Sequence, residues 1–249
     1  MKTALVTGAA RGIGLATARL FLKEGWQVAI IDRDAPALQD AAAGLEGVYP
    51  HTCDISDEAS VAEMVRDVTE RFGRLDALVN NAGVADFGPI EDTTFARWRR
   101  VMETNLDGPF LCTQAATPAL KETKGAVVNI ASISGLRAST LRVAYGTSKA
   151  AVAHLTLQQA VELGEFGIRV NCVAPGPVRT KLAMAVHSQD IIDAYHDAIP
   201  LARYGTEAEI AEAIVFLCSE RASYITGQIL AADGGFEATG IGLPALRKG

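Results

Sequence analysis

The chain has 249 residues, of which 49% are hydrophobic and 21% charged, so it can bury a large core and is neither disordered nor fibrous. Its 23 basic and 29 acidic side chains give a net charge of −6, which excludes a general attraction to nucleic acid or anionic lipid but not a local basic patch. The four cysteines are too far apart for a metal site or a disulfide framework: Cys53, Cys112, Cys172 and Cys218. We therefore expect free thiols in a reducing, cytoplasmic compartment and no metal.

Short runs rich in valine and isoleucine alternate with longer segments of helical periodicity. The expected strands are 3–6, 27–31, 48–53, 77–79, 126–131, 169–174 and 228–231. The expected helices are 14–23, 60–72, 95–120, 145–163 and 207–219. Strands this apolar are buried on both faces. The pattern predicts an α/β fold: one domain, 1–249, with a doubly wound parallel sheet of about seven strands and helices on both faces.

Two helix starts and the C-terminal segment carry local signals. Ser56-Asp57 and Thr206 occupy N-cap positions, and Glu209 follows Thr206 by three residues as in a capping box. The last segment, 236–249, has no periodicity, so it is either a loose tail or a packed element. Its leucines at 243 and 246 favour packing, and we expect an inter-subunit element.

The first expected strand runs into a glycine-rich turn, and a helix follows. Gly8, Gly12 and Gly14 would let the chain turn tightly, approach a pyrophosphate and pack the helix against the strand. The helix N-terminus would offer free N–H groups to the phosphates. A glycine-rich turn without a ligand is the alternative, but the position between the first strand and the first helix favours a dinucleotide.

Asp32 ends the second expected strand, 18 residues after Gly14. A carboxylate there can accept both adenosine ribose hydroxyls and would repel a 2′-phosphate. The alternative role is a helix N-cap, for which Asp34 is better placed. Arg11 and Arg33 favour NADP instead, because they could neutralise a 2′-phosphate. We give the carboxylate more weight and expect NAD rather than NADP.

Tyr145 and Lys149 are four residues apart on an expected helix and share one face. An ammonium group beside a tyrosine favours the phenolate, so such a pair can exchange a proton with an alcohol or a carbonyl. A tyrosine and a lysine at this spacing also occur often by chance, one packing and the other reaching solvent. The pair alone therefore does not establish catalysis.

Several motifs in one order make the pattern specific. They are Thr7-Gly8-x-x-x-Gly12-x-Gly14, Asn80-Asn81-Ala82-Gly83, Ser132, Tyr145-x-x-x-Lys149 and Pro175-Gly176. Together they resemble the short-chain dehydrogenase/reductase family over nearly the whole chain. The resemblance implies a Rossmann fold, an NAD(P)-dependent oxidoreductase acting on CH–OH groups, and a homotetramer or homodimer formed through helices 95–120 and 145–163.

The resemblance implies four catalytic residues: Ser132, Tyr145, Lys149 and Asn105. Ser132 would bond the reacting oxygen, Lys149 would also bind the nicotinamide ribose, and Asn105 would hold a water beside the lysine. The alternative for Asn105 is a side chain that bridges a helix irregularity.

The expected cofactor contacts lie at the carboxyl ends of the strands. They are Gly8, Arg11, Gly12, Ile13, Gly14, Asp32, Arg33, Asp54, Ile55, Asn80, Ala82, Gly83, Tyr145, Lys149, Pro175, Gly176, Val178 and Thr180. Two of these assignments have alternatives in the same motifs. Asn80 would contact the cofactor while Asn81 is structural, and Asp54 could instead be a turn residue.

Segment 181–204 is expected to be a substrate lid and contains His187, Tyr195 and His196. The pocket mouth is expected near Asp86, Ser134, Arg137, Thr140 and Arg142. A polar pocket fits a polyol, sugar or hydroxy acid, although each of these residues taken singly is expected to be solvated. The basic cluster Arg97, Arg99 and Arg100 is interpreted as a solvated face or subunit contact, not a nucleic-acid site.

These features favour an NAD-dependent enzyme that interconverts a small-molecule secondary alcohol and its ketone. One alternative is a 3-oxoacyl-[acyl-carrier-protein] reductase that uses NADPH. Asp32 and Phe166, where relatives often have a basic residue, count against it. The other alternative is a non-catalytic dinucleotide-binding sensor, against which the complete catalytic set counts. The substrate, the direction and the stereochemistry do not follow from the sequence.

Overall fold

The sheet of the computed structural model has seven parallel strands, and the structure describes residues 1–180, 184 and 187–240. The strands are β1 (Thr3–Thr7), β2 (Gln27–Asp32), β3 (Val48–Thr52), β4 (Ala77–Asn80), β5 (Ala126–Ile130), β6 (Arg169–Pro175) and β7 (Ile229–Ala232). Their order is β3-β2-β1-β4-β5-β6-β7, and every neighbouring pair is parallel. This confirms the predicted doubly wound sheet, and the order of the strands reverses between β1 and β4.

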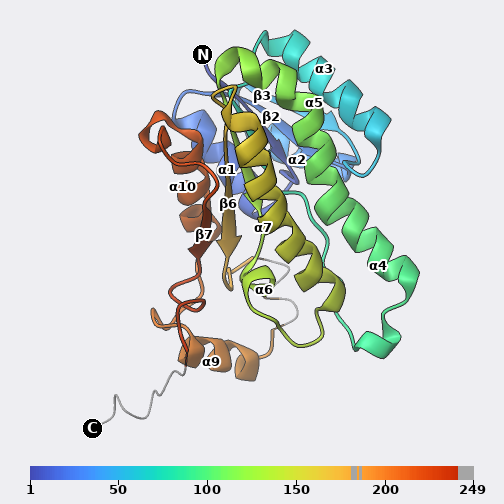
Figure 1. Ribbon diagram of the computed structural model, residues 1–249, viewed down its shortest axis with the longest axis vertical. Helices are drawn as coiled ribbons and strands as arrows, with labels where there is room; N and C mark the ends of the chain where they lie inside the picture. Colours follow the sequence, from blue (N-terminus) through green and yellow to red (C-terminus); the bar gives the residue numbers. More distant parts are fainter. Residues whose placement is uncertain (181–183, 185–186, 241–249) are drawn as a thin grey trace.

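Helices cover both faces of the sheet (Figure 1). One face packs against α1 (Gly12–Lys23), α2 (Ala35–Ala43) and α10 (Glu207–Cys218). The other packs against α3 (Glu58–Phe72), α5 (Gly108–Thr123) and α7 (Val143–Gly164). The five inner strands are almost entirely buried, as their unbroken apolar runs predict, whereas the edge strands β3 and β7 are partly exposed. All four cysteines are free and buried.

The expected helix over 95–120 is wrong as one element. The structure divides it into α4 (Phe95–Met102), a π-helical turn η2 (Glu103–Asp107) and α5. Pro109 lies in the first turn of α5, where a missing N–H is tolerated, and Gly108 fits tightly against Ile55. A Cβ on Gly108 would lie 2.5 Å from Ile55 Cδ1, so only glycine allows this approach at the start of α5. Hydrophobic periodicity does not report such a bulge.

Three helices were not expected. They are α2, α6 (Ile133–Leu136) and α9 (Gln189–Ala198). The first two are short, and α9 belongs to the expected lid, so none carries a long apolar stripe. The N-cap of α2 was nevertheless recognisable, because the Asp34 carboxylate accepts from the Ala37 N–H at 3.2 Å.

The predicted caps of two other helices are confirmed. Asp57 caps α3 by accepting from the Ser60 N–H at 2.7 Å, and Thr206 with Glu209 forms the capping box of α10. Two 3₁₀ turns, η1 (Ile90–Asp92) and η3 (Glu220–Ala222), complete the described elements.

Two of the predicted segments lie partly outside the residues that the structure describes. Most of the C-terminal segment, 241–249, and part of the expected lid, 181–183 with 185–186, lie outside them. Within the described ranges, no helix is long and apolar enough to cross a membrane. The same ranges contain no group of three or more histidine, cysteine or acidic side chains that could hold a metal.

Candidate active site

The glycine-rich turn between β1 and α1 is held by neighbouring strands. The Asn81 amide donates to the Thr7 and Gly8 carbonyls at 2.9 and 3.0 Å. A Cβ on Gly8 would lie 2.7 Å from the Ala82 Cα, so only glycine allows this approach. Gly12 has φ +61°, and a Cβ there would meet only the Glu207 carboxylate, at 3.8 Å. The backbone beside Gly12 is therefore open to a ligand.

The start of α1 has no side-chain cap. Its N-cap residue, Arg11, makes no capping bond, and the first turn of the helix contains no acidic residue. The first N–H groups and the positive end of the helix dipole therefore remain for an anion. Together with the open backbone at Gly12, this arrangement fits the pyrophosphate of a dinucleotide.

Carboxylates hold both arginines that could have contacted a 2′-phosphate. Arg11 is paired with Asp34, and Arg33 Nη1 lies 3.8 Å from Asp54 Oδ2. Asp32 itself ends β2 and accepts from the Ala10 N–H at 3.2 Å, which brings its carboxylate to the glycine-rich turn. The charge at the end of β2 is therefore negative.

Three predicted cofactor contacts have other roles for their side chains. Asn80 is buried and donates to Asn129 Oδ1 at 2.8 Å, inside the fold, whereas its neighbour Asn81 lines the pocket. Ile55 is buried against Gly108, and Asp54 accepts from the Ser56 hydroxyl at 2.7 Å. The side chain of Asp54 therefore acts as a turn residue, which was the alternative to a cofactor contact.

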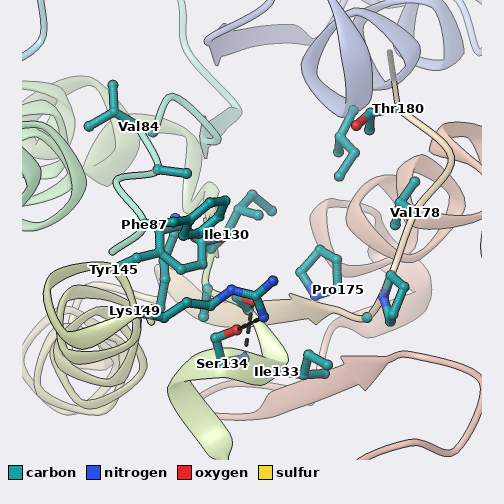
Figure 2. Close-up of a pocket in the computed structure, with 18 of the residues that line it drawn as sticks. Val84, Phe87, Ile130, Ile133, Ser134, Tyr145, Lys149, Pro175, Val178 and Thr180 are labelled. Carbon is teal, nitrogen blue, oxygen red and sulfur yellow. Dashed lines mark hydrogen bonds between the residues drawn. The ribbon is translucent and has the colours of Figure 1, made fainter. Parts of the chain in front are cut away.

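A cavity of about 290 Å³ opens at the carboxyl ends of β4, β5 and β6 (Figure 2). Eight of the predicted cofactor residues line it: Ile13, Gly83, Tyr145, Lys149, Pro175, Gly176, Val178 and Thr180. The catalytic candidate Ser132 lines it as well. The remaining predicted contacts lie along the same edge of the sheet, toward β1, β2 and β3.

Ser132 and Tyr145 come together in this cavity. Ser132 caps α6 directly after β5, and Tyr145 lies in the first turn of α7. Burial raises the pKa of Tyr145, whereas a hydrogen bond from Ser132 and the positive charge of Arg142 lower it. The serine therefore contacts the atom that would exchange a proton with a substrate.

Lys149 is one turn further along α7 and is buried. Its ammonium donates to the Ile130 carbonyl at 2.7 Å and lies 5.9 Å from the centre of the Tyr145 ring. Burial lowers the pKa of Lys149 to about 8. A lysine with this pKa can give or take a proton near neutral pH.

Asn105 lies in the π-helical turn and is fully buried. It binds both backbone groups of Val84: Oδ1 accepts from N–H at 2.8 Å and Nδ2 donates to C=O at 2.9 Å. It also donates to Ser148 Oγ at 3.0 Å. Asn105 thus links α7 to the loop after β4, rather than bridging an irregularity within its own helix.

Gly83 leaves space between Asn105 and Lys149. A Cβ on this glycine would lie 3.2 Å from Asn105 Oδ1 and 3.4 Å from Lys149 Nζ. The two polar atoms therefore face one small volume that a side chain would fill, next to the lysine.

Comparisons with known proteins agree with this geometry. The family model described as Enoyl-(Acyl carrier protein) reductase matches residues 8–237. Meso-2,3-butanediol dehydrogenase from Serratia marcescens is 37% identical over 96% of this chain and 95% of that protein. The chain belongs to the short-chain dehydrogenase/reductase family. It is an oxidoreductase that acts on CH–OH groups.

Other members of the short-chain dehydrogenase/reductase family resemble it equally well. Cis-4-hydroxycyclohexanecarboxylate dehydrogenase from Sinomonas cyclohexanicum is 41% identical over 95% of this chain and 97% of that protein. A 3-oxoacyl-[acyl-carrier-protein] reductase from Thermotoga maritima is 38% identical over 94% and 97%. The crystal structure of levodione reductase superimposes with a TM-score of 0.91 at 33% identity, covering 96% of this chain and 98% of that one.

The mouth of this pocket differs from the expectation for single residues. Ser134, Arg142 and His187 line the cavity instead of being simply solvated, and Tyr195 of the expected lid lines it as well. Arg137 instead lies 3.8 Å from Glu237, and Thr140 and His196 are not among the lining residues.

Asp86 is bound by the arginine cluster. Arg97 Nε lies 3.0 Å from both Asp86 oxygens, and Arg100 Nη2 donates to Oδ2 at 2.8 Å. Arg97 and Arg100 thus bind the loop after β4 through Asp86, although the Arg100 side chain remains 62% exposed. Arg99 instead lies 3.4 Å from Glu103 on the same helix surface.

Phe87 is the principal lining residue that the sequence did not indicate. It is 47% exposed and packs edge-on against Tyr145, with ring centres 6.0 Å apart (Figure 2). It lies in an irregular loop without periodicity, after Asn80-Asn81-Ala82-Gly83. An exposed aromatic residue this soon after the family motif was the only available signal.

Proposed function

We propose that this enzyme is an NAD-dependent dehydrogenase or reductase of a secondary alcohol and its ketone, with a polyol-, sugar- or hydroxy-acid-like substrate. The observation that carries the proposal is the meeting of Ser132, Tyr145 and Lys149 at one wall of the cavity. The relatives named for butanediol and hydroxycyclohexanecarboxylate support the substrate class.

Each residue of the site has its own role in the proposed reaction. Tyr145 exchanges the proton of the substrate hydroxyl, and Ser132 bonds the reacting oxygen. Lys149 holds positive charge near the phenol and passes the proton on toward Asn105. The nicotinamide cofactor supplies hydride transfer when bound. The glycine-rich turn and the uncapped start of α1 hold its pyrophosphate.

The charges at the end of β2 support NAD over NADP. Asp32 is placed to bind the adenosine ribose, and the two nearby arginines are already paired with Asp34 and Asp54. A 2′-phosphate would face a carboxylate without a free cation among the described residues there. The same argument disfavours the NADPH-dependent acyl-carrier-protein reductase.

The experiment measures steady-state turnover of a panel of polyols, sugars, hydroxy acids and simple alcohols with NAD and NADP. We expect a preference for NAD. Asp32→Asn removes the repelling charge at constant size and should lower the NAD/NADP ratio of kcat/KM by about 10-fold or more, because a hydrogen bond to a charged group contributes roughly 1.5–3 kcal/mol. Tyr145→Phe should reduce turnover about 10²- to 10⁴-fold with nearly unchanged NAD binding.

Asp40→Asn is the control for Asp32→Asn, since it removes an exposed carboxylate on α2 that holds neither of the two arginines near the ribose. Retained activity in Tyr145→Phe would refute the proton-transfer role. Tight NAD binding without turnover on the whole panel would favour a dinucleotide sensor. A preference for NADPH and activity on 3-oxoacyl thioesters would favour the carrier-protein reductase.

We further propose a single functional domain, with 1–180 binding cofactor and carrying catalysis, 181–204 as substrate lid and 236–249 as an inter-subunit element. We propose a homotetramer, or a homodimer, without nucleic-acid or membrane partners. Apolar side chains exposed on α4, α5 and α7 support subunit contacts. The four buried free thiols support a cytoplasmic location.

A further inference from the structure

The charge of the cavity is opposite to that of the chain. The chain has a net charge of −6, yet none of the described residues that line the cavity is aspartate or glutamate. Two lining residues are cationic, Lys149 and Arg142. A substrate that enters the cavity therefore meets positive charge and no fixed negative charge.

The two cations differ in how fully the protein uses them. Lys149 is buried and donates to the Ile130 carbonyl at 2.7 Å. Arg142 makes two hydrogen bonds, to Ser134 Oγ and Tyr195 OH, both 3.5 Å long and both from Nη1. Among the described residues, Nε and Nη2 of Arg142 have no hydrogen-bond partner, and no carboxylate pairs with it. A guanidinium has five N–H donors, so most of its capacity remains.

Other arginines of the same chain have guanidinium groups that are fully paired with a carboxylate. Arg74 binds both oxygens of Asp76, at 2.8 and 2.6 Å, and Arg203 binds both oxygens of Glu209, at 3.0 and 2.6 Å. The residues that the structure does not describe include no aspartate or glutamate, so none of their side chains could supply a carboxylate to Arg142.

Arg142 is also close to the reacting atoms. It precedes α7 by one residue and Tyr145 by three, and its charge lowers the pKa of Tyr145. Its guanidinium carbon lies 4.9 Å from the centre of the Phe87 ring, which packs edge-on against Tyr145 (Figure 2). The ring holds the cation in place without occupying its hydrogen-bond donors.

We infer that Arg142 binds a carboxylate of the substrate, so that the enzyme selects a short hydroxy acid and its keto acid over neutral alcohols. This inference rests on the proposed function for the reacting hydroxyl but not on the coenzyme preference. A guanidinium binds a carboxylate through two parallel N–H···O bonds, and Nε with Nη2 forms such a pair of donors. The other end of the substrate, with its hydroxyl, then lies toward Ser132 and Tyr145.

The rest of the wall favours a singly charged, small ligand. Apolar side chains of Val84, Phe87 and Ile133 line the cavity, whose volume is about 290 Å³. One uncommitted guanidinium pairs with one carboxylate through two hydrogen bonds, which leaves no unpaired charge in apolar surroundings.

The test compares acids with amides of the same shape. The probes are 3-hydroxybutanoate, 4-hydroxypentanoate and 4-hydroxycyclohexanecarboxylate, each against its primary carboxamide. We expect wild-type kcat/KM to favour the acid about 10- to 100-fold. Arg142→Gln removes charge from beside Tyr145 and should lower turnover of both substrate classes, but it should lower kcat/KM for the acids about 10-fold more than for the amides, mainly by raising KM for the acids. Arg142→Lys should retain part of the preference.

Arg71→Gln is the matched control. Arg71 also lies over an aromatic ring, that of Tyr49 at 5.7 Å, but on α3 and away from the cavity, so the acid preference should be unchanged. Equal kcat/KM for acids and amides in the wild type would overturn the inference. Equal losses on acids and amides in Arg142→Gln would also overturn it, because the arginine would then only support the cavity wall.

Binding without turnover separates this inference from the proposed function. Titration calorimetry with cyclohexanecarboxylate and its carboxamide, in the presence of NAD, needs no reaction. Tighter binding of the acid, lost in Arg142→Gln, would support the inference even if no alcohol on the panel is oxidised. Equal binding of acid and amide, together with turnover of neutral alcohols, would overturn the inference and leave the proposed function in place.

Discussion

Lys149 illustrates how one buried residue combines a proposed catalytic role with a cost in stability. Its ammonium is held by the Ile130 carbonyl within the fold, and burial lowers its pKa to about 8. A charged group in such a position destabilises the folded state, because water no longer solvates it. The same lowered pKa prepares it to move a proton near neutrality.

The pH dependence of stability follows from this shift. Below about pH 8 the lysine is protonated in both states, and the full cost of burying its charge is present. Between about pH 8 and the unfolded pKa near 10.4, the unfolded state binds more protons, so stability rises with pH. Relative to Lys149→Met, the free energy of unfolding of the wild type should therefore increase by on the order of 2 kcal/mol from pH 7 to pH 10.

Urea denaturation of both proteins at pH 7 and pH 10 measures this difference. Comparing wild type with variant cancels the titration of the buried cysteines and of other groups. Lys23→Met, at the exposed end of α1, is the control in which no buried charge is removed. A wild-type-minus-variant difference that stays constant between the two pH values would contradict the lowered pKa.

At the scale of elements, a buried chain of amides attaches α7 to the sheet. Asn80 of β4 donates to Asn129 of β5 at 2.8 Å. Asn129 in turn donates to Thr156 at 3.0 Å and Gln159 at 2.9 Å, both on α7. The helix that presents Tyr145 and Lys149 is thus fixed by hydrogen bonds as well as by apolar packing.

Asn129→Ala should lower the free energy of unfolding by about 1–3 kcal/mol, because it leaves buried partners on both sides without a bond. Asn80→Ala removes the donor of the hydrogen bond between Asn80 and Asn129. The double variant should therefore lose less free energy of unfolding than the sum of the two single losses. Denaturant unfolding of the four proteins provides the cycle. Strictly additive losses would mean that the two amides do not interact.

The sequence predicts the elements unevenly, for physical reasons. The inner strands were located because central parallel strands are continuous apolar runs, and the edge strands β3 and β7 were located from shorter runs of the same kind. The long helix over 95–120 was wrong as one element because hydrophobic periodicity continues through the π-helical turn at Glu103–Asp107. In the site, Tyr145 and Lys149 were predicted from several motifs in one order, because their helical spacing alone does not establish catalysis. The place of Phe87 and the freedom of Arg142 depend on which loops meet, and periodicity does not contain that information.

At the scale of the whole molecule, apolar residues remain exposed on one helical layer. Phe95 of α4 is 76% exposed, Phe110 of α5 47% and Val161 of α7 80%. Patches of this kind on a folded chain mark interaction surfaces. They lie on the helices that carry the proposed subunit contacts.

Size exclusion with light scattering should give a mass four times that of the chain, or twice in the case of a dimer. Val161→Asp places a charge in this layer and should shift the mass toward smaller species. Gln39→Asp, exposed on α2 of the opposite layer, is the control and should leave the mass unchanged. A monomeric wild type would refute the proposed assembly.

The strand order has a consequence for how the protein is made. β1 lies at the centre of the sheet, and the contacts that shape the phosphate turn come from residues 3–83. The proton-transfer wall needs β5, α7 and β6, which leave the ribosome later. Because α1 packs against α10, which is made near the end of the chain, the nucleotide half completes its core only after the catalytic half has been made. A nascent chain stalled after β4 would expose the strand edge that β5 later covers and the face of α1 that α10 later covers, and such surfaces make an intermediate prone to aggregation.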